Sequence, residues 1–373
     1  MKKILRDIKN KIYDIPSWKT NRKIVVFESD DWGTVRMSSK QNYDKLLNAG
    51  VRVDKDAYCR YDALESEEDL VMLFEVLSSH KDKNNNPCIF TANTLVANPD
   101  FEKIKADNFN NYHFEPVTET FKKYPKHTSC FTLWQEGRDK NVFYNQFHGR
   151  EHLNVDRWLH YLQSGSEETL MAFNMGMFGI STTITNENRK SFMAAFDADS
   201  GSQIEKQKLI ITEGLDMFKA LFKYSSESFI APNYIYSDIL EEDLHKAGVK
   251  YLQGGRVQKM PDPAGKGSTK KTHYLGQENK FGQTYLVRNV LFEPSFDNTK
   301  DWVNQSLLEI EKSFKNKKPA IISSHRLNYI GYIDQSNRDN NLKLLNTLLS
   351  RITSKWPDVE FMTSNQLGDT IQK

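Results

Sequence analysis

Short apolar runs alternate with amphipathic segments along most of the chain. Eight runs rich in β-branched and aromatic residues predict strands over 24–29, 88–93, 128–134, 228–231, 249–252, 284–292, 320–324 and 359–363. Five segments with apolar residues at helical spacing predict helices over 67–80, 210–224, 237–248, 302–315 and 341–355. This alternation indicates parallel βα units, arranged either as a barrel or as an open doubly wound sheet.

The N-terminal residues 1–20 carry a separate pattern. Four apolar residues fall on one face of a helix: Ile4, Leu5, Ile8 and Ile12. We expect a helix packed on its own domain, with a basic amphipathic helix lying on a membrane surface as the alternative. No secretory signal and no apolar run of transmembrane length is evident, so we expect a cytoplasmic protein.

The rest of the chain, residues 21–373, contains no clear linker. We therefore expect a single domain with insertions around 95–147 and 254–283. The second insertion is basic and rich in Gly and Pro, as surface excursions are. The sequence does not determine an oligomeric state.

Composition narrows the classes of function. The 51 Lys and Arg residues nearly balance the 49 Asp and Glu residues, which gives no support for a nucleic acid partner. Aromatic residues make up 12% of the chain, a content that suits flat ligands such as sugar rings as well as a core. Three scattered cysteines, Cys59, Cys88 and Cys130, predict reduced, packed thiols. P-loop, G-x-S-x-G and G-x-G-x-x-G motifs do not occur.

Two adjacent carboxylates, Asp30 and Asp31, follow the first predicted strand in the stretch VVFESDDWG. One interpretation is a helix N-cap with a second acid facing the helix dipole. The other is that one carboxylate binds a cation while its neighbour acts as a base. A bound cation would remove the repulsion that makes such a pair unfavourable.

Histidines supply further candidate chemistry. His148 and His152 are four residues apart in FHGREHLN, so on a helix both imidazoles would reach a single ion. With Asp31 they would form a three-ligand site with an open position for water, as in catalytic zinc sites. His325 ends the predicted strand AIISS, where barrel active sites lie. The alternative for each of these histidines is a structural role in the core or on the surface.

In this order the motifs resemble those of the polysaccharide deacetylase family, family four of the carbohydrate esterases, over roughly residues 23–371. ESDDWG is similar to the family's T-F-D-D-G, and HGREH to its H-S/T-x-x-H. FIAPNY resembles the surroundings of its R-x-P-Y motif, and IISSH its late strand ending in L-x-H. The resemblance implies an α/β fold, a distorted (β/α)7 barrel of the TIM-like type.

The resemblance also implies roles for the candidate residues. Asp30 corresponds to the catalytic base and His325 to the general acid. Asp31, His148 and His152 correspond to the metal ligands, which implies Zn²⁺ or another divalent transition metal as cofactor.

The chain departs from the family pattern at the residue that holds the base. Ile230 stands where the family has an Arg, and an aliphatic side chain cannot form that charge-assisted bond. Arg288 and Arg326 are the candidates to replace it. The family's fourth motif is echoed only by Asp297 or Asp301, close to Trp302.

The expected function is metal-dependent hydrolysis of N- or O-linked acetyl groups on a sugar or polysaccharide. Trp32, Asn233 and Tyr234 are expected to line the sugar site, and the backbone amide of Asn233 to hold the oxyanion. One alternative is a carbohydrate-binding protein with impaired catalysis, which the missing Arg favours. Another is a glycosidase on a related barrel, with Glu28 and Glu293 as its two acids.

Overall fold

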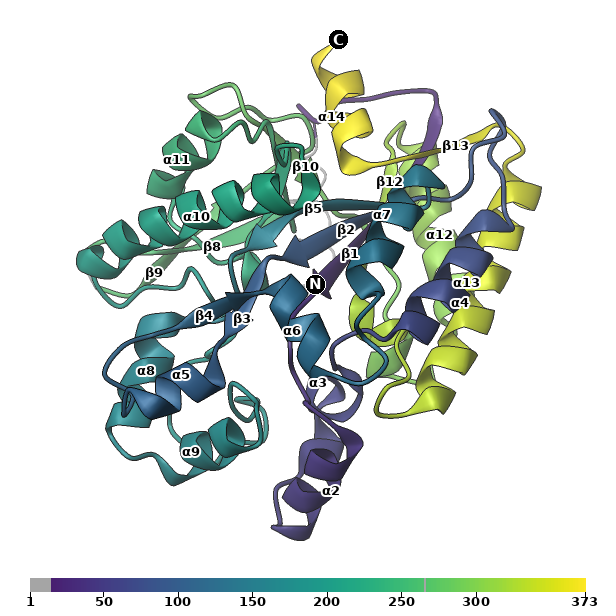
Figure 1. The fold of residues 1–373 in the computed structure, drawn as a ribbon. Helices are drawn as coiled ribbons and strands as arrows, with labels where there is room; N and C mark the ends of the chain where they lie inside the picture. The colour runs from purple at the N-terminus through teal and green to yellow at the C-terminus, as the bar shows by residue number, and fades with distance from the viewer. Residues whose placement is uncertain (1–14, 265) are drawn as a thin grey trace, which may run out of the picture.

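The structure is a computed structural model that describes residues 15–264 and 266–373. The helix expected near the N-terminus, with Ile4, Leu5, Ile8 and Ile12, lies outside the described residues. A curled parallel sheet occupies the centre of the molecule, with helices on both sides (Figure 1). Among the described residues, no helix combines the length and the apolar composition that crossing a bilayer requires.

Within the described residues the central sheet has nine strands. They are β1 (Lys23–Trp32), β2 (Phe90–Leu95), β5 (Phe143–Gly149), β6 (Ser228–Ile230), β7 (Tyr251–Gly254), β10 (Thr284–Val287), β11 (Val290–Leu291), β12 (Ala320–His325) and β13 (Val359–Met362). Eight of them follow the order β10-β7-β6-β5-β2-β1-β12-β11, and β13 pairs with the first half of β1. All of these pairings are parallel, which confirms the predicted α/β class with a parallel sheet.

The strand register brings the candidate chemistry to one end of the sheet. Asp30 in β1 lies opposite His325 in β12. On its other edge β1 pairs with β2, and β2 pairs with β5, which carries His148. Because all these strands run in the same direction, their carboxyl ends lie together at one end of the sheet.

Helices cover the sheet and its carboxyl end. They are α2 (Lys40–Asn48), α3 (Ala57–Tyr61), α4 (Glu67–Ser78), α5 (Phe101–Ala106), α6 (Val117–Lys123), α7 (Cys130–Asp139), α8 (Val155–Gln163), α9 (Glu167–Asn174), α10 (Gly201–Phe222), α11 (Glu241–Lys246), α12 (Trp302–Lys315), α13 (Gln335–Lys355) and α14 (Ser364–Gln372). In Figure 1, α10 and α11 lie on one side of the sheet and α4, α12 and α13 on the other.

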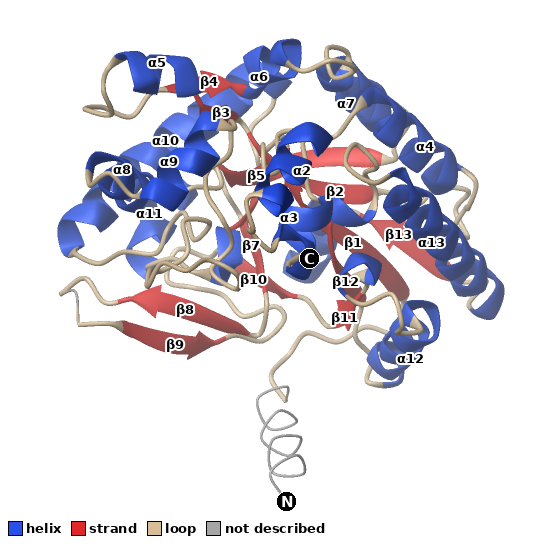
Figure 2. Cartoon of the chain, turned by 90° about the horizontal axis from the view of Figure 1, so that it is seen from below, coloured by secondary structure: helices blue, strands red, loops and turns tan. Residues whose placement is uncertain are grey.

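Two antiparallel ribbons lie outside the central sheet. β3 (Ala97–Pro99) pairs with β4 (Phe114–Pro116), and β8 (Val257–Pro261) pairs with β9 (Ser268–Thr272). Both ribbons fall within the stretches predicted as insertions. The β8–β9 hairpin projects at one edge of the molecule (Figure 2).

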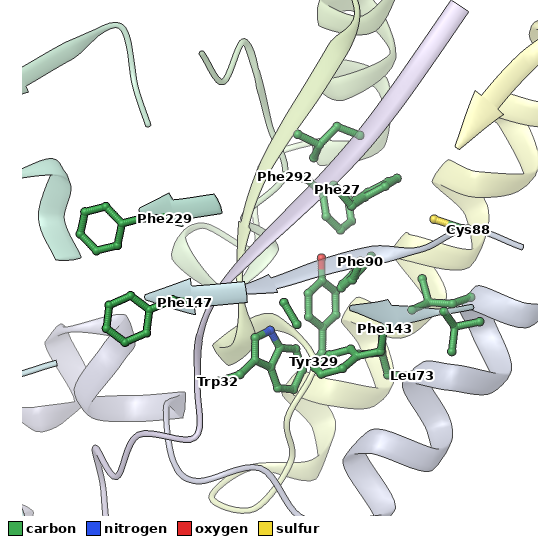
Figure 3. Close-up of a cluster of buried hydrophobic side chains, with 14 of the residues drawn as sticks. Phe27, Trp32, Leu73, Cys88, Phe90, Phe143, Phe147, Phe229, Phe292 and Tyr329 are labelled. Atoms are coloured by element: carbon green, nitrogen blue, oxygen red, sulfur yellow. The ribbon is translucent and has the colours of Figure 1, made fainter. Parts of the chain in front are cut away.

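Aromatic side chains fill the core between the sheet and the helices (Figure 3). Phe27 stacks on Phe90 with ring centroids 5.3 Å apart, and Trp32 meets Phe143 edge-on at 4.9 Å. Such pairs add to the free energy gained by burying the rings. Much of the high aromatic content therefore serves the core. The three cysteines are buried and free, as predicted.

The structure corrects the sequence prediction at three elements. The strand predicted over 284–292 is divided into β10 and β11, because the chain passes from pairing with β7 to pairing with β12. Residues 128–134 were predicted as a strand, but Cys130–Asp139 form α7, because buried Cys130, Trp134 and Gly137 recur at helical spacing. β5 was not predicted, because Asn145 and Gln146 interrupt its apolar pattern. Both are buried, with Asn145 bonded to Thr94 and Gln146 accepting from the backbone of Ser228. Each of the five predicted helices is present.

Candidate active site

A cavity of about 490 Å³ opens at the carboxyl ends of β1, β5 and β12. Its lining includes all five residues predicted to act as base, acid or metal ligand: Asp30, Asp31, His148, His152 and His325. These residues are far apart in the sequence. The parallel register of the sheet brings them together.

A β-bulge in β1 explains how two adjacent carboxylates can face one cavity. In the pairing with β2, the stretch from Ser29 to Trp32 contains one more residue than its partner stretch, and Asp31 adopts a left-handed φ of 77°. Successive side chains of a regular strand point to opposite faces, but a bulge re-aims them. Asp30 and Asp31 therefore both line the cavity, where they contact different partners.

Asp31, His148 and His152 form a compact buried cluster. Asp31 Oδ1 lies 3.2 Å from Nε2 of His148 and 3.2 Å from Nε2 of His152, and one ligand atom from each residue lies within 4.8 Å of the others. His148 Nδ1 lies 2.8 Å from the carbonyl oxygen of Ile230. A neutral imidazole that donates this bond keeps its lone pair on Nε2, which faces the cluster.

The two histidines do not share a helical turn, contrary to the sequence prediction. His148 belongs to β5, and α8 begins only at Val155. Gly149, with a φ of 146°, ends the strand, and the loop after it brings His152 back so that the two ring centroids are 5.2 Å apart. The two histidines, four residues apart, are therefore brought together by the end of a strand and the loop that follows it.

The electrostatics of this cluster suit a metal ion. Burial tends to raise the pKa of Asp31, but the two imidazoles and Arg36 outweigh it and hold that pKa well below its ordinary value. Burial lowers the pKa of His152 to about 4, although Asp31 opposes the shift. A carboxylate and a neutral imidazole are the forms that bind metals, and two nitrogens with one oxygen fit Zn²⁺ and similar divalent ions.

Asp30 is held by Arg288. The guanidinium forms a two-pronged pair with the carboxylate, Nη2 to Oδ1 at 2.6 Å and Nη1 to Oδ2 at 2.7 Å. Asn93 donates to Oδ1 at 2.7 Å, and Arg288 Nε also donates to Glu28 at 2.6 Å. Burial tends to raise the pKa of Asp30, but Arg288 lowers it below its ordinary value. Arg288 thus supplies the charge that Ile230 cannot.

Arg326, the other candidate partner of the base, was wrongly proposed for that role. It is fully buried and donates to Asp62 at 2.8 Å and to Glu65 at 2.8 Å. These acids lie on the segment between α3 and α4. Arg326 therefore ties this segment to the end of β12.

His325 is held by a buried carboxylate that the sequence analysis assigned elsewhere. His325 Nδ1 lies 2.6 Å from Glu293, whose other oxygen accepts from Asn328 at 2.7 Å. Burial tends to lower the pKa of His325, but Glu293 raises it to about 9. Asp301 instead caps α12, and Asp297 accepts from Thr299, so neither supplies the fourth motif.

Asn233 and Tyr234 line the cavity, and Tyr234 Oη lies 3.1 Å from Arg288 Nη1. Trp32 does not line it. Its side chain is fully buried, and its indole N–H donates to Ser29 at 3.0 Å. A regular strand would place Trp32 on the same face as Asp30, but the bulge reverses that parity and turns the ring into the core.

The two acids of the glycosidase alternative are not arranged for that chemistry. Glu28 and Glu293 are both fully buried. Glu28 is bonded to Arg288 and Ser364, and Glu293 to His325 and Asn328. Neither is among the residues that line the cavity.

Arg36 and Tyr58 also contact residues of the site, and neither was predicted from the sequence. Arg36 Nη2 lies 3.4 Å from Asp31 Oδ2, and its guanidinium lies over the ring of Tyr58 at 5.2 Å. The Tyr58 ring in turn meets His325 edge-on at 5.7 Å. Both residues come from the segment between β1 and α4, and neither lies at the end of a predicted strand, where candidate residues were sought.

Neither a protein-family model nor a curated protein sequence matches the chain. Among solved structures, the fold is similar to that of a "putative polysaccharide deacetylase" from Mycobacterium smegmatis, with 11% identity, a TM-score of 0.44 and coverage of 95% of this chain and 92% of that one. For a "putative glycoside hydrolase/deacetylase" from Parabacteroides distasonis the values are 9%, 0.49, 95% and 72%. For a CE4 family pseudoenzyme from Bacillus anthracis they are 11%, 0.38, 94% and 66%. These likenesses concern the fold and assign no activity to this chain.

Proposed function

We propose that this protein is a metal-dependent hydrolase that removes N- or O-linked acetyl groups from a carbohydrate. The observation that carries the proposal is the grouping of three units around one cavity. They are the Asp31, His148 and His152 cluster, the Asp30–Arg288 pair and the His325–Glu293 pair.

Asp31, His148 and His152 would hold the metal, and Zn²⁺ is the ion that their donor atoms suit best. When bound, a divalent ion there supplies polarisation of a water molecule and of the acyl carbonyl. The protein supplies an ionised carboxylate, two imidazole nitrogens and a buried setting, in which electrostatic interactions are stronger than in water.

The proton transfers follow from the two charged pairs. Asp30, kept ionised by Arg288, accepts a proton from the attacking water. His325, kept protonated by Glu293, donates a proton to the departing nitrogen or oxygen. Two titratable groups whose surroundings separate their pKa values in this way are suited to act as base and acid. The backbone N–H of Asn233, in a left-handed turn at the cavity wall, is the proposed oxyanion donor.

The pairing of Asp30 with Arg288 also favours catalysis over the alternative of a binding protein. That alternative drew its support from the missing Arg at Ile230. Arg288 reaches the same carboxylate from the junction of β10 and β11.

The sheet order supports the distorted (β/α)7 barrel of the polysaccharide deacetylases. β10 and β11 lie at the two ends of the order, yet only Arg288 and Asn289 separate them along the chain. The N–H of Arg288 donates to Gly254 at the end of β7, and that of Asn289 to Ile321 in β12. Counted as one bent strand, β10 and β11 would close a ring of seven with β1, β2, β5, β6, β7 and β12.

Acetate release with and without metal tests the proposal. Purified protein is assayed with N-acetylated and O-acetylated sugars, then after chelation and again after Zn²⁺ is restored. We expect acetate release that chelation abolishes and Zn²⁺ recovers. Release that survives complete metal removal would contradict the proposal. New reducing ends without acetate would indicate a glycosidase, and sugar binding without turnover would indicate a binding protein.

The pH dependence of the reaction depends on Glu293. His325 can donate a proton only below its pKa of about 9, so kcat/KM is expected to fall as the pH rises through that value. In Glu293→Gln the main cause of the raised pKa is removed while burial still lowers it, so the alkaline limb should move to lower pH. The exposed Asp297→Asn serves as the control, with an unchanged limb. An unchanged limb in Glu293→Gln would contradict the assignment of this limb to a His325 whose pKa is raised by Glu293.

A further inference from the structure

One wall of the cavity comes from an irregular stretch, residues 175–200, which we call the capping segment. It connects α9 to α10 and contains no helix or strand. The part that lines the cavity is largely apolar. Four of its side chains are about 2% exposed: Met177, Phe178, Ile180 and Phe192.

The capping segment is fixed by bonds to neighbouring elements. The N–H of Asn154 donates to the carbonyl of Phe192 at 2.6 Å, and Arg157 donates to Ser191 at 2.8 Å. Within the segment, Arg189 lies 3.9 Å over the ring of Phe192 and donates to the carbonyl of Ile180. The wall is therefore held in place by backbone and side-chain contacts.

The carboxylate of Asp56 forms a bridge between this wall and α3, another element that lines the cavity. Asp56 Oδ2 accepts from Ser181 at 2.9 Å and from Thr183 at 2.6 Å. Through its other oxygen Asp56 caps α3, accepting from Cys59 at 3.0 Å. The same helix carries Tyr58, whose ring packs against His325. The bridge thus joins the capping segment to the side of the cavity where the proposed acid lies.

We propose that the cavity admits a single acylated sugar unit, free or at the end of a chain, and excludes units inside a polymer. This inference rests on the proposed function and specifies its substrate. An internal unit needs an exit for the chain on both sides. Asp56, Ser181 and Thr183 all line the cavity and are joined by direct hydrogen bonds, so a chain has no passage between their two segments. The volume of about 490 Å³ falls within the range of about 300–1,000 Å³ typical of small-molecule sites. The apolar wall suits a nonpolar ring face or an acyl methyl group.

The position of hydrolysis on defined oligomers tests the inference. The probes are N-acetylglucosamine oligomers and O-acetylated xylo-oligosaccharides, each compared with its monomer and its polymer. Mass spectrometry of the products locates the unit that has lost acetate. We expect loss from a terminal unit and poor turnover of the polymer. Equal loss from internal units would overturn this inference and leave the proposed function intact. No acetate from any probe would count against the proposed function.

Removing the bridge tests its role directly. The double variant Ser181→Ala/Thr183→Val eliminates both donors to Asp56 with little change in shape. Its ratio of polymer to monomer kcat/KM is expected to rise by about tenfold, a typical scale for steric discrimination in a pocket. Asn188→Ala, exposed on the same segment and absent from the cavity lining, should leave the ratio unchanged. An unchanged ratio in a folded double variant would show that the bridge does not select the substrate.

Discussion

Replacing His152 with alanine is expected to eliminate tight metal binding and, with it, acetate release. His152 is one of three converging ligands, and its Nε2 lies 3.2 Å from Asp31 Oδ1. Loss of a group that merely orients a ligand typically weakens metal affinity by about 10–100-fold, so loss of a ligand should cost at least about 100-fold. The two remaining ligands cannot define a three-ligand site with one open position.

Metal analysis of dialysed protein and titration calorimetry with Zn²⁺ measure this loss independently of activity. His160→Ala is the matched control, because His160 is exposed on α8, eight residues further along the chain. It should bind one equivalent of Zn²⁺ like the parent protein. Asp31→Asn removes the charge of another ligand and should give the same loss if His152→Ala proves unstable. One tightly bound equivalent in both ligand variants would show that the metal lies elsewhere.

The candidate base and acid could be predicted because of one shared feature, an apolar run shortly before each of them. Residues 24–27 lead through Glu28 and Ser29 to Asp30, and residues 320–322 lead through two serines to His325, so the polar residues at these strand ends stand out in the sequence. β5 lacks this feature. Its buried Asn145 and Gln146 are tolerated because Thr94 and the backbone of Ser228 satisfy them, and these partners lie on other strands. A strand stabilised by such distant partners leaves little pattern of its own.

The arginine that pairs with the proposed base Asp30 could not be identified from the sequence alone. Arg326 follows the acid His325 directly and looked as good a candidate as Arg288. At the end of a strand, however, neighbouring side chains point to opposite sides, and Arg326 turns toward Asp62 and Glu65. The sequence contained the correct arginine but no signal that ranked it first.

The bulge in β1 is another feature that could not be predicted from the sequence. Period-two alternation predicts that Asp30 and Trp32 share a face and that Asp31 points away. One extra residue brings Asp31 into the cavity and sends Trp32 to the core. Because the register shift arises from pairing with β2, the local sequence of β1 could not reveal it.

Replacing Arg288 with methionine is expected to destabilise the fold as well as abolish activity. Asp30 and Glu28, which are 3% and 0% exposed, would both lose their cationic partner. Removing one member of a buried ion pair typically costs about 3–5 kcal/mol, because the remaining charge stays desolvated. The pKa of Asp30 would also rise without Arg288, since burial would then dominate, and the base would be protonated at a higher pH.

Urea unfolding measures the free energy of unfolding. Acetate release at several pH values shows the pH at which the base Asp30 becomes protonated. Arg288→Lys keeps the charge but loses the two-pronged geometry, so it should recover stability better than activity. Adding Glu28→Gln to Arg288→Met removes one of the two unpaired charges and should restore part of the lost stability. Arg52→Met, which breaks an exposed pair with Asp54, should change stability little. If Arg288→Met proved as stable as the parent protein and kept its pH profile, Arg288 would not be the residue that keeps Asp30 ionised.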